Sequence, residues 1–216
     1  MVVNLCTLLK YGYIMLFFEG YIVGLGMIVF IGPVFFLLLS ISLHQGTKAG
    51  VATAFGIVIS DLICVCLCYF GVTNFLNDTN AKMAILVIGG ILLIILGLKY
   101  LFHSGKFEDK REVPKGYHYL SCFTKGFLVN FVNPFVFFVW IGVVTFQRNM
   151  GDTLYNSLLF FSGALAGILS TDLLKVFTAR QIKSILSENV LRNLYKASGL
   201  ILIGFGISAT LSSRLE

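Results

Sequence analysis

Long apolar stretches separated by short polar segments form the dominant pattern of this chain. A helix needs about 20 mainly apolar residues to cross the hydrocarbon core of a bilayer, and about six stretches reach that length. They are Met15–Leu43, Val51–Thr73, Met83–Phe102, Ser121–Phe146, Leu154–Phe177 and Leu191–Leu211. Their apolar residues are continuous rather than alternating, so the pattern predicts spanning helices and not the strands of a barrel.

The composition agrees with this interpretation, because 57% of the 216 residues are hydrophobic and only 12% are charged. A water-soluble domain of this size does not need so large an apolar fraction. The apolar run after Lys10 has no small-residue cleavage site, so we interpret it as the first span and residues 1–13 as a short extension. Met15 is a second candidate for the start of the protein. We predict an all-α polytopic membrane protein with one transmembrane domain, residues 1–216.

Lysine and arginine are unevenly divided between the two sides of the predicted membrane. The odd-numbered loops hold 12 of the 16 basic residues, and the opposite side holds 4. The positive-inside rule therefore places the odd-numbered loops in the cytoplasm and both termini outside. The loop from Lys99 to Lys125 also carries Glu108, Asp109 and Glu112, so its charge is mixed. We expect membrane lipid around the protein and no nucleic acid as a partner.

A charged segment near the middle, residues 103–120, divides the chain into two halves with three predicted spans each. Repeat one covers residues 15–102 and repeat two covers residues 121–212. An odd number of spans per half requires the second repeat to insert upside down relative to the first. This inverted-repeat arrangement is typical of many secondary transporters.

Each half opens with a span that carries a proline: Pro33 follows Gly32 in the first span, and Pro134 follows Asn133 in the fourth. Proline removes a backbone donor and clashes with the preceding turn, so both helices should kink or break there. Backbone groups freed at two such breaks can hold a zwitterion or an ion at the middle of the membrane. A simple packing kink is the alternative for each proline.

An aspartate lies in the middle of the second span, where an ionisable side chain costs about 2.5–3.5 kcal/mol on insertion scales. The segment GIVISD, which ends at Asp61, recurs in the fifth span as GILSTD, which ends at Asp172. Asp61 has no basic residue within a helical turn, so we predict that it binds and releases a coupling proton. Asp172 has Lys175 one turn further on, so proton coupling and a structural ion pair both stay open for it.

The two aspartates are not equally spaced from the prolines. Asp61 follows Pro33 by 28 residues, whereas Asp172 follows Pro134 by 38. The two matched segments therefore reach the same depth only if the fifth helix starts late.

Two amides lie beside the break of the fourth span: Asn130 and Asn133, three residues apart on one helix face. They can bind the polar end of a substrate or link helices by hydrogen bonds, and both uses stay open. In the first span, Gly20, Gly24 and Gly26 clear a face for close packing of a helix or a substrate. The predicted substrate-binding residues are Gly32, Pro33, Asn130, Asn133 and Pro134.

Five segments occur in an order and spacing that is more specific than any one of them. They are IGPVFFLL at 31–38, QGTKAG at 45–50, the segment 56–61, KGFLVNFVNPFVFF at 125–138, and a glycine-marked last helix at 199–206. Together they resemble the LysE/RhtB family of amino-acid exporters over nearly the whole chain from about residue 16. At one position the chain departs from this pattern, because Val34 stands where many relatives have asparagine after the first proline.

The resemblance implies a six-helix exporter of the cell inner (plasma) membrane, which moves amino acids or similar small metabolites outward at the expense of the proton gradient. It places the substrate site between the two proline-broken helices, with the acid at Asp61 beside it. We predict a secondary transporter that works by alternating access, with a small-molecule substrate and protons as its partners. A homodimer is left open as the working unit.

Three of the five cysteines, Cys64, Cys66 and Cys68, follow Asp61 in the second span. They suggest an alternative function, a soft heavy-metal exporter or a membrane thiol-redox carrier, with Cys122 as a further ligand or redox partner. Cys64 and Cys68 share a helix face and Cys66 points away from it, so at most two thiols converge there. Apolar packing is the simpler use of these side chains.

Enzyme chemistry finds little support in the sequence. The chain has neither a phosphate-binding glycine loop with its lysine nor an HExxH motif. We therefore predict that the protein is not an enzyme and has no catalytic residue, metal site or cofactor.

Overall fold

The computed structural model describes residues 5–29, 32–75, 79–102, 119–150, 153–185 and 188–212. Every regular element within these ranges is helical, which confirms the predicted all-helical class. The elements are α1 (Leu5–Gly26), the short 3₁₀ helix η1 (Met27–Val29), α2 (Pro33–His44), α3 (Thr47–Phe75), α4 (Thr79–Leu101), α5 (Tyr119–Phe131), α6 (Pro134–Met150), α7 (Leu154–Phe177), α8 (Ala179–Ile185) and α9 (Glu188–Ser212). Most of the predicted linker 103–120 lies outside the described residues.

Most of the predicted spans correspond to a single helix. The second, third, fifth and sixth apolar runs correspond to α3, α4, α7 and α9, with ends that differ by a few residues. The first run divides into α1, η1 and α2, and the fourth divides into α5 and α6. Two features were not predicted: α1 begins at Leu5 rather than Met15, and the short helix α8 follows α7.

Both proline-bearing spans are broken, as predicted, and each proline is the first residue of a new helix. Pro33 begins α2 after the extended residue Gly32, and Pro134 begins α6 two residues after α5 ends at Phe131. The axes of α5 and α6 differ by 68°. A proline at the first helical position loses no hydrogen bond, because the amide there would have no partner within the helix.

Two of the described helices, α3 and α7, are by themselves long and apolar enough to cross a membrane. A third span is reached if the bent pair α5 and α6 is counted as one. The apolar parts of α1, α2, α4 and α9 within the described ranges are shorter, 10–17 residues each. The polytopic helical character is therefore supported, whereas the count of six spans stays a prediction.

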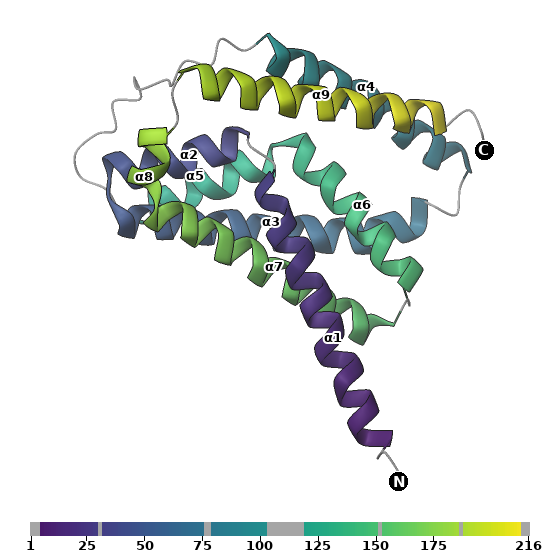
Figure 1. The fold of residues 1–216 in the computed structure, drawn as a ribbon. Helices are drawn as coiled ribbons and strands as arrows, with labels where there is room; N and C mark the ends of the chain where they lie inside the picture. The colour runs from purple at the N-terminus through teal and green to yellow at the C-terminus, as the bar shows by residue number, and fades with distance from the viewer. Residues whose placement is uncertain are drawn as a thin grey trace.

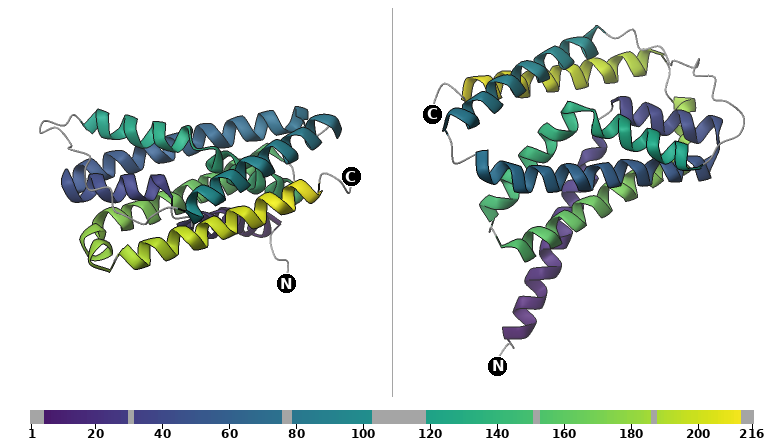
Figure 2. Two further views of the ribbon diagram at one scale, coloured as in Figure 1. Left: turned by 90° about the horizontal axis from the view of Figure 1, so that it is seen from above. Right: turned by 180° about the vertical axis from the view of Figure 1, so that it is seen from behind.

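The helices pack mainly in three pairs: α1 with α7, α3 with α5, and α4 with α9. Figure 1 shows α4 and α9 lying together along one side of the molecule, above the bundle formed by the other helices. The two views of Figure 2 show the same arrangement from above and from behind. Three elements of that bundle, α2, α3 and α7, meet around the middle of the molecule.

Glycines bring the backbones of α1 and α7 into contact. A Cβ added to Gly20 would come within 1.9 Å of the Phe160 carbonyl oxygen, and one added to Gly24 within 2.1 Å of the Ala164 carbonyl oxygen. Any side chain there would overlap the facing backbone, so close helix packing is confirmed as the use of these two positions. Gly26 is different, because a Cβ there would meet none of the described residues within 4 Å.

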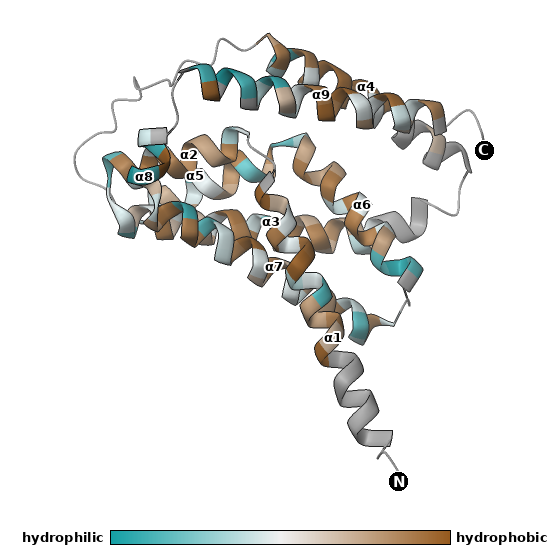
Figure 3. Ribbon diagram, in the orientation of Figure 1, coloured by the Kyte–Doolittle hydropathy of each residue, from teal (hydrophilic) through white to brown (hydrophobic). Residues whose placement is uncertain are grey.

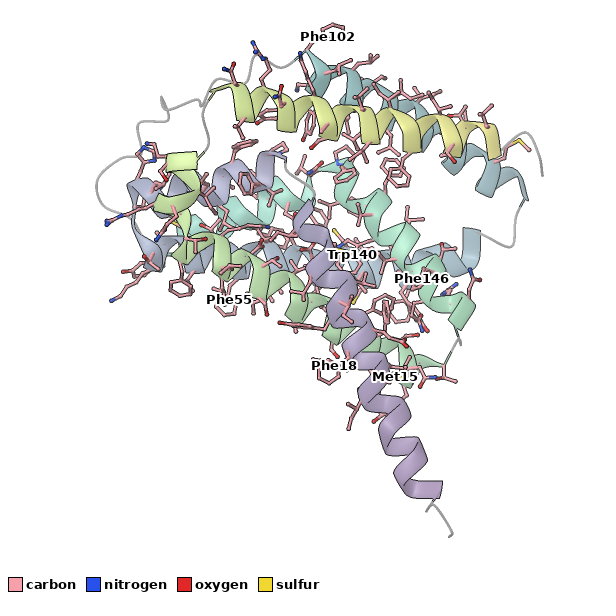
Figure 4. All side chains as sticks on the ribbon, viewed as in Figure 1. Met15, Phe18, Phe55, Phe102, Trp140 and Phe146 are labelled. Carbon is pink, nitrogen blue, oxygen red and sulfur yellow. The ribbon has the colours of Figure 1, made fainter. Side chains whose placement is uncertain are left out.

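The outer surface of the helices is largely apolar, as Figure 3 shows by hydropathy. Figure 4 labels five large apolar side chains that lie at the edge of the molecule and one, Trp140, that lies inside. Phe102 is 79% exposed and Trp140 is 1% exposed. An apolar exterior of this extent is what a protein surrounded by lipid requires, because lipid tails do not penalise exposed hydrocarbon.

Candidate functional site

A cavity lies where the two broken spans meet. Its volume is about 120 Å³, several times the roughly 10–15 Å³ that one water needs. Both breaks contribute to its lining, Gly32 from the first and Asn133 from the second. Residues of α3, α7, α4 and α9 complete the wall, so the cavity lies between the bundle and the α4–α9 pair. The site is therefore assembled from segments that are far apart in the sequence.

Asp61 faces this cavity and is 5% exposed. Its Oδ1 atom accepts two hydrogen bonds of 2.9 Å, one from Nε1 of Trp140 and one from Nδ2 of Asn130. Both donors are neutral, and they come from α6 and α5, on opposite sides of the second helix break. The Asp61 carboxyl group therefore holds the two parts of the bent span in a fixed relation to α3.

Asn130 is buried at the end of α5 and belongs to this hydrogen-bonded group. Besides Asp61, its Nδ2 atom lies 3.2 Å from Oγ of Ser60 and 3.3 Å from the Ile57 carbonyl oxygen. An amide nitrogen has two hydrogens, so the three acceptors share them. Asn130 thus links α5 to α3 and also lines the cavity, which combines the two uses that the sequence left open.

Asn133 has a local structural role at the break itself. Its side-chain Oδ1 accepts a hydrogen bond of 3.2 Å from the Phe135 amide in the first turn of α6. Such a bond satisfies one of the amides that a helix start leaves without a partner. Asn133 also lines the cavity. Neither proline does, and Pro33 and Pro134 act through the helix starts that they create.

The second acid, Asp172, also faces the cavity and is 5% exposed. Its Oδ1 atom lies 2.9 Å from Nζ of Lys175, so the predicted ion pair is present. Its Oδ2 atom is buried and has no hydrogen-bond partner among the described residues. Both aspartates reach the same cavity although their spacing from the prolines differs. Part of the difference lies in the late start of α7, which begins 20 residues after Pro134, whereas α3 begins 14 residues after Pro33.

The structure adds residues to the site that the sequence did not single out. Trp140, Tyr100 and Thr171 line the cavity, as does Lys175, which the sequence offered only as a partner of Asp172. Trp140 carries a weak signal in the sequence, since it is the single tryptophan and follows Pro134 by six residues. Tyr100 had no signal, because only the packing of α4 against the bundle brings its hydroxyl group next to Gly32.

The cysteines of α3 do not form a metal site with other described residues. Cys64 and Cys68 are buried and Cys66 is exposed, as the helix geometry predicted. The Cys122 thiol donates to Oε1 of Gln45 at 3.0 Å. No group of three histidine, cysteine, aspartate or glutamate side chains that could hold a metal ion occurs in the described part of the chain. No observation therefore favours the thiol-dependent alternative.

Comparison with known proteins agrees with the resemblance seen in the sequence motifs. An amino acid efflux protein of Bacillus subtilis (strain 168), YcgF, whose name is given as provisional, is 28% identical over 197 residues, covering 88% of this chain and 92% of that protein. The leucine efflux proteins of Salmonella typhimurium (strain LT2) and Salmonella typhi are each 30% identical over 120 residues, covering 53% of this chain and 55% of each relative. No solved structure matches the chain.

The family comparison covers most of the chain. A model of the family described as LysE type translocator matches residues 25–213, which include both helix breaks, both aspartates and Lys175. The predicted membership is confirmed, and so is the prediction of a transporter rather than an enzyme. The chain is a member of the LysE type translocator family, an integral membrane protein of helices.

Proposed function

We propose that this protein exports amino acids from the cytoplasm, and that the cavity between the two broken spans is its substrate site. The observation that carries the proposal is the convergence of both helix breaks and both intramembrane aspartates on one cavity. Acids are expensive in a membrane and in transporters commonly mark substrate or proton pathways. The relatives named for amino acid and leucine efflux support the substrate class.

An inverted repeat of three spans in each half is part of the proposal. The contacts are consistent with it, because the first span of each half packs against the second span of the other half. Gly24 faces the Ala164 carbonyl oxygen, and Gly126 faces the Thr53 carbonyl oxygen. The members of the second contact follow those of the first by nearly the same offsets that relate Pro33 to Pro134 and Asp61 to Asp172. A twofold relation between the halves would produce this exchange.

Alternating access requires the cavity to close toward one side at a time. At the end of the bundle away from Lys175, α3, α6 and α7 are joined by polar contacts. Ser157 donates to Oε1 of the buried Gln147 at 3.0 Å, and Arg148 donates to the Tyr69 carbonyl oxygen at 2.8 Å. These contacts keep that end closed in the present conformation. Rocking of the two halves would have to break them to release a substrate outward.

Asp61 is the proposed carrier of the coupling proton, and Asp172 is the second acid in the pathway. Asp61 meets neutral donors only among its hydrogen bonds, so gain or loss of a proton changes its charge without breaking an ion pair. Gly32, Asn130 and Asn133 line the proposed substrate site, and Pro33 and Pro134 hold the helix breaks open. Such a carrier belongs in the cell inner membrane, with the odd-numbered loops and α8 in the cytoplasm and both termini outside.

Reconstitution into proteoliposomes tests the function directly. We expect counterflow of labelled L-leucine or another amino acid in vesicles that hold the purified protein, and none in empty vesicles. An imposed pH gradient should then drive net movement of the same solute. Counterflow should persist after alkylation of the cysteines. Silence with all twenty amino acids, together with thiol-dependent movement of cadmium or copper, would refute amino-acid export.

A further inference from the structure

The ion pair at the end of α7 has a charged atom without a partner. Asp172 gives one carboxylate oxygen to Lys175, and its second oxygen is buried beside the cavity without a hydrogen bond to any described residue. A buried polar atom that lacks a partner costs about 1–3 kcal/mol, and more when it is charged. Native proteins keep such an atom where a ligand satisfies it in another state.

We propose that Asp172 and Lys175 form the subsite that recognises the backbone of a free amino acid. The ammonium group of the substrate binds Oδ2 of Asp172, its carboxylate binds Nζ of Lys175, and an uncharged side chain lies against the apolar wall of the cavity. This assignment rests on the proposed function, amino-acid export, and adds to it the orientation and the side-chain class of the substrate.

The charges of the cavity support this orientation. A zwitterion that leaves water needs a partner of opposite sign for each of its two charges. Among the described residues that line the cavity, only Asp61, Asp172 and Lys175 are acidic or basic. Lys175 is the only cation of the three, and Asp172 lies one helical turn from it. The pair therefore offers both signs within a distance that suits the two ends of an amino-acid backbone.

Asp61 is less suited to bind the ammonium group. Its Oδ1 atom already accepts hydrogen bonds from Trp140 and Asn130, which fix the carboxyl group against α5 and α6. Asp172 has no such anchor besides Lys175. Lys175 in turn lies 6.0 Å from the centre of the Phe35 ring, an aromatic contact that can support the ammonium group when the carboxylate of Asp172 turns toward a substrate.

The remaining wall of the cavity determines the side chain that fits. It is mostly apolar, with Val136 and Val139 from α6, Ile168 from α7, and Ile201 and Leu202 from α9. When Asp61 holds the coupling proton, the cavity has no further charge for a cationic or anionic substrate side chain. An aliphatic side chain needs no such partner. We therefore expect selection for aliphatic amino acids over lysine and glutamate.

Binding of three related probes to the purified full-length protein tests the subsite. L-Leucine carries both backbone charges, 4-methylpentanoate lacks the ammonium group, and L-leucinamide lacks the carboxylate. Calorimetric titration should show that the wild type binds leucine at least about tenfold more tightly than either analogue. The preference over 4-methylpentanoate should fall below about threefold in Asp172→Asn, and the preference over leucinamide should do the same in Lys175→Gln. L-Lysine and L-glutamate should bind at least about tenfold more weakly than leucine.

Two further variants keep the result interpretable. Lys196→Gln removes an exposed lysine of α9 and should leave all ratios unchanged. Asp172→Asn with Lys175→Gln leaves no unpaired charge, so it provides a folded protein if either single variant fails to fold, and both preferences should be lost in it. Unchanged preferences in folded variants would overturn the subsite while amino-acid export stands. A wild type that binds no amino acid would overturn export itself, and tighter binding of lysine or glutamate would overturn the side-chain assignment.

Discussion

The two buried aspartates have different surroundings although their sequence segments are similar. Asp61 is held by two neutral donors, Trp140 and Asn130, whereas Asp172 is paired with a cation. A group held by neutral donors can lose its charge and keep its geometry, because an amide or a protonated carboxyl still offers an acceptor oxygen. The division of roles proposed above follows from this difference.

Replacement of Asp61 separates its chemical role from its structural role. In Asp61→Asn the amide oxygen still accepts from Trp140 and Asn130, so we expect a folded protein that has lost gradient-driven export. In Asp61→Ala both donors lose their acceptor inside the protein, which should lower stability by about 1–3 kcal/mol for each donor. Transport in proteoliposomes under a pH gradient and thermal unfolding in detergent measure the two effects. Full gradient-driven export by Asp61→Asn would remove this residue from the coupling mechanism.

The sequence predicted part of the site at the scale of single residues. The motif repeat and the cost of charge in a membrane pointed to Asp61 and Asp172, and Gly32, Asn130 and Asn133 were identified beside the breaks. All five line the cavity. Trp140 and Tyr100 were missed because their importance depends on which helices pack together, and one sequence carries no direct record of that. The roles assigned to all of these residues stay proposals.

At the scale of the elements, the helices are joined by glycines whose positions match across each contact. In the α4–α9 pair, Gly90 faces Gly206 and Gly97 faces Gly199, in register with two antiparallel helices. In a membrane the hydrophobic effect does not drive helices together, so close van der Waals contact between backbones supplies much of the association. This pair lies over one side of the cavity and contributes Tyr100, Ser198 and Leu202 to it.

Two glycines of the same helix provide a matched test of that contact. A Cβ on Gly206 would come within 2.6 Å of the Gly90 carbonyl oxygen, whereas a Cβ on Gly204 would meet none of the described residues within 4 Å. We expect Gly206→Leu to lower the stability by at least about 1–3 kcal/mol through overpacking. Gly204→Leu should have no measurable effect. Thermal unfolding of both variants in one detergent decides, and equal melting temperatures would show that the α4–α9 contact does not support the fold.

At the scale of the whole molecule, the ends of the helices separate into two groups. Figure 1 shows α8 and the turn between α2 and α3 at one end, and the C-terminal end of α9 at the other. Lys48 and Lys183 are exposed at the first end, and Thr153, which caps α7, is exposed at the other. The proposed topology places the first group in the cytoplasm.

Single cysteines at these positions test the topology. In a protein without its five native cysteines, a maleimide that cannot cross the membrane should label Thr153→Cys from outside intact cells. It should label Lys48→Cys and Lys183→Cys only after the membrane is opened. The reagent reaches only thiols in water on its own side, so the pattern reports sidedness directly. Labelling of both lysine positions in intact cells would reverse the assigned orientation.

The sequence by itself determined the class of this protein, the places where its helices break, and the acids that need an explanation. These properties are local, because hydropathy, a missing amide hydrogen at proline and the cost of a charge in lipid depend on the nature of a residue and its near neighbours. Only the tertiary structure decided that both breaks and both acids meet in one cavity, that Trp140 and Asn130 hold Asp61, and that α4 and α9 cover one side. Those contacts join segments far apart in the chain, and packing between helix surfaces selects among many arrangements that the same local pattern permits.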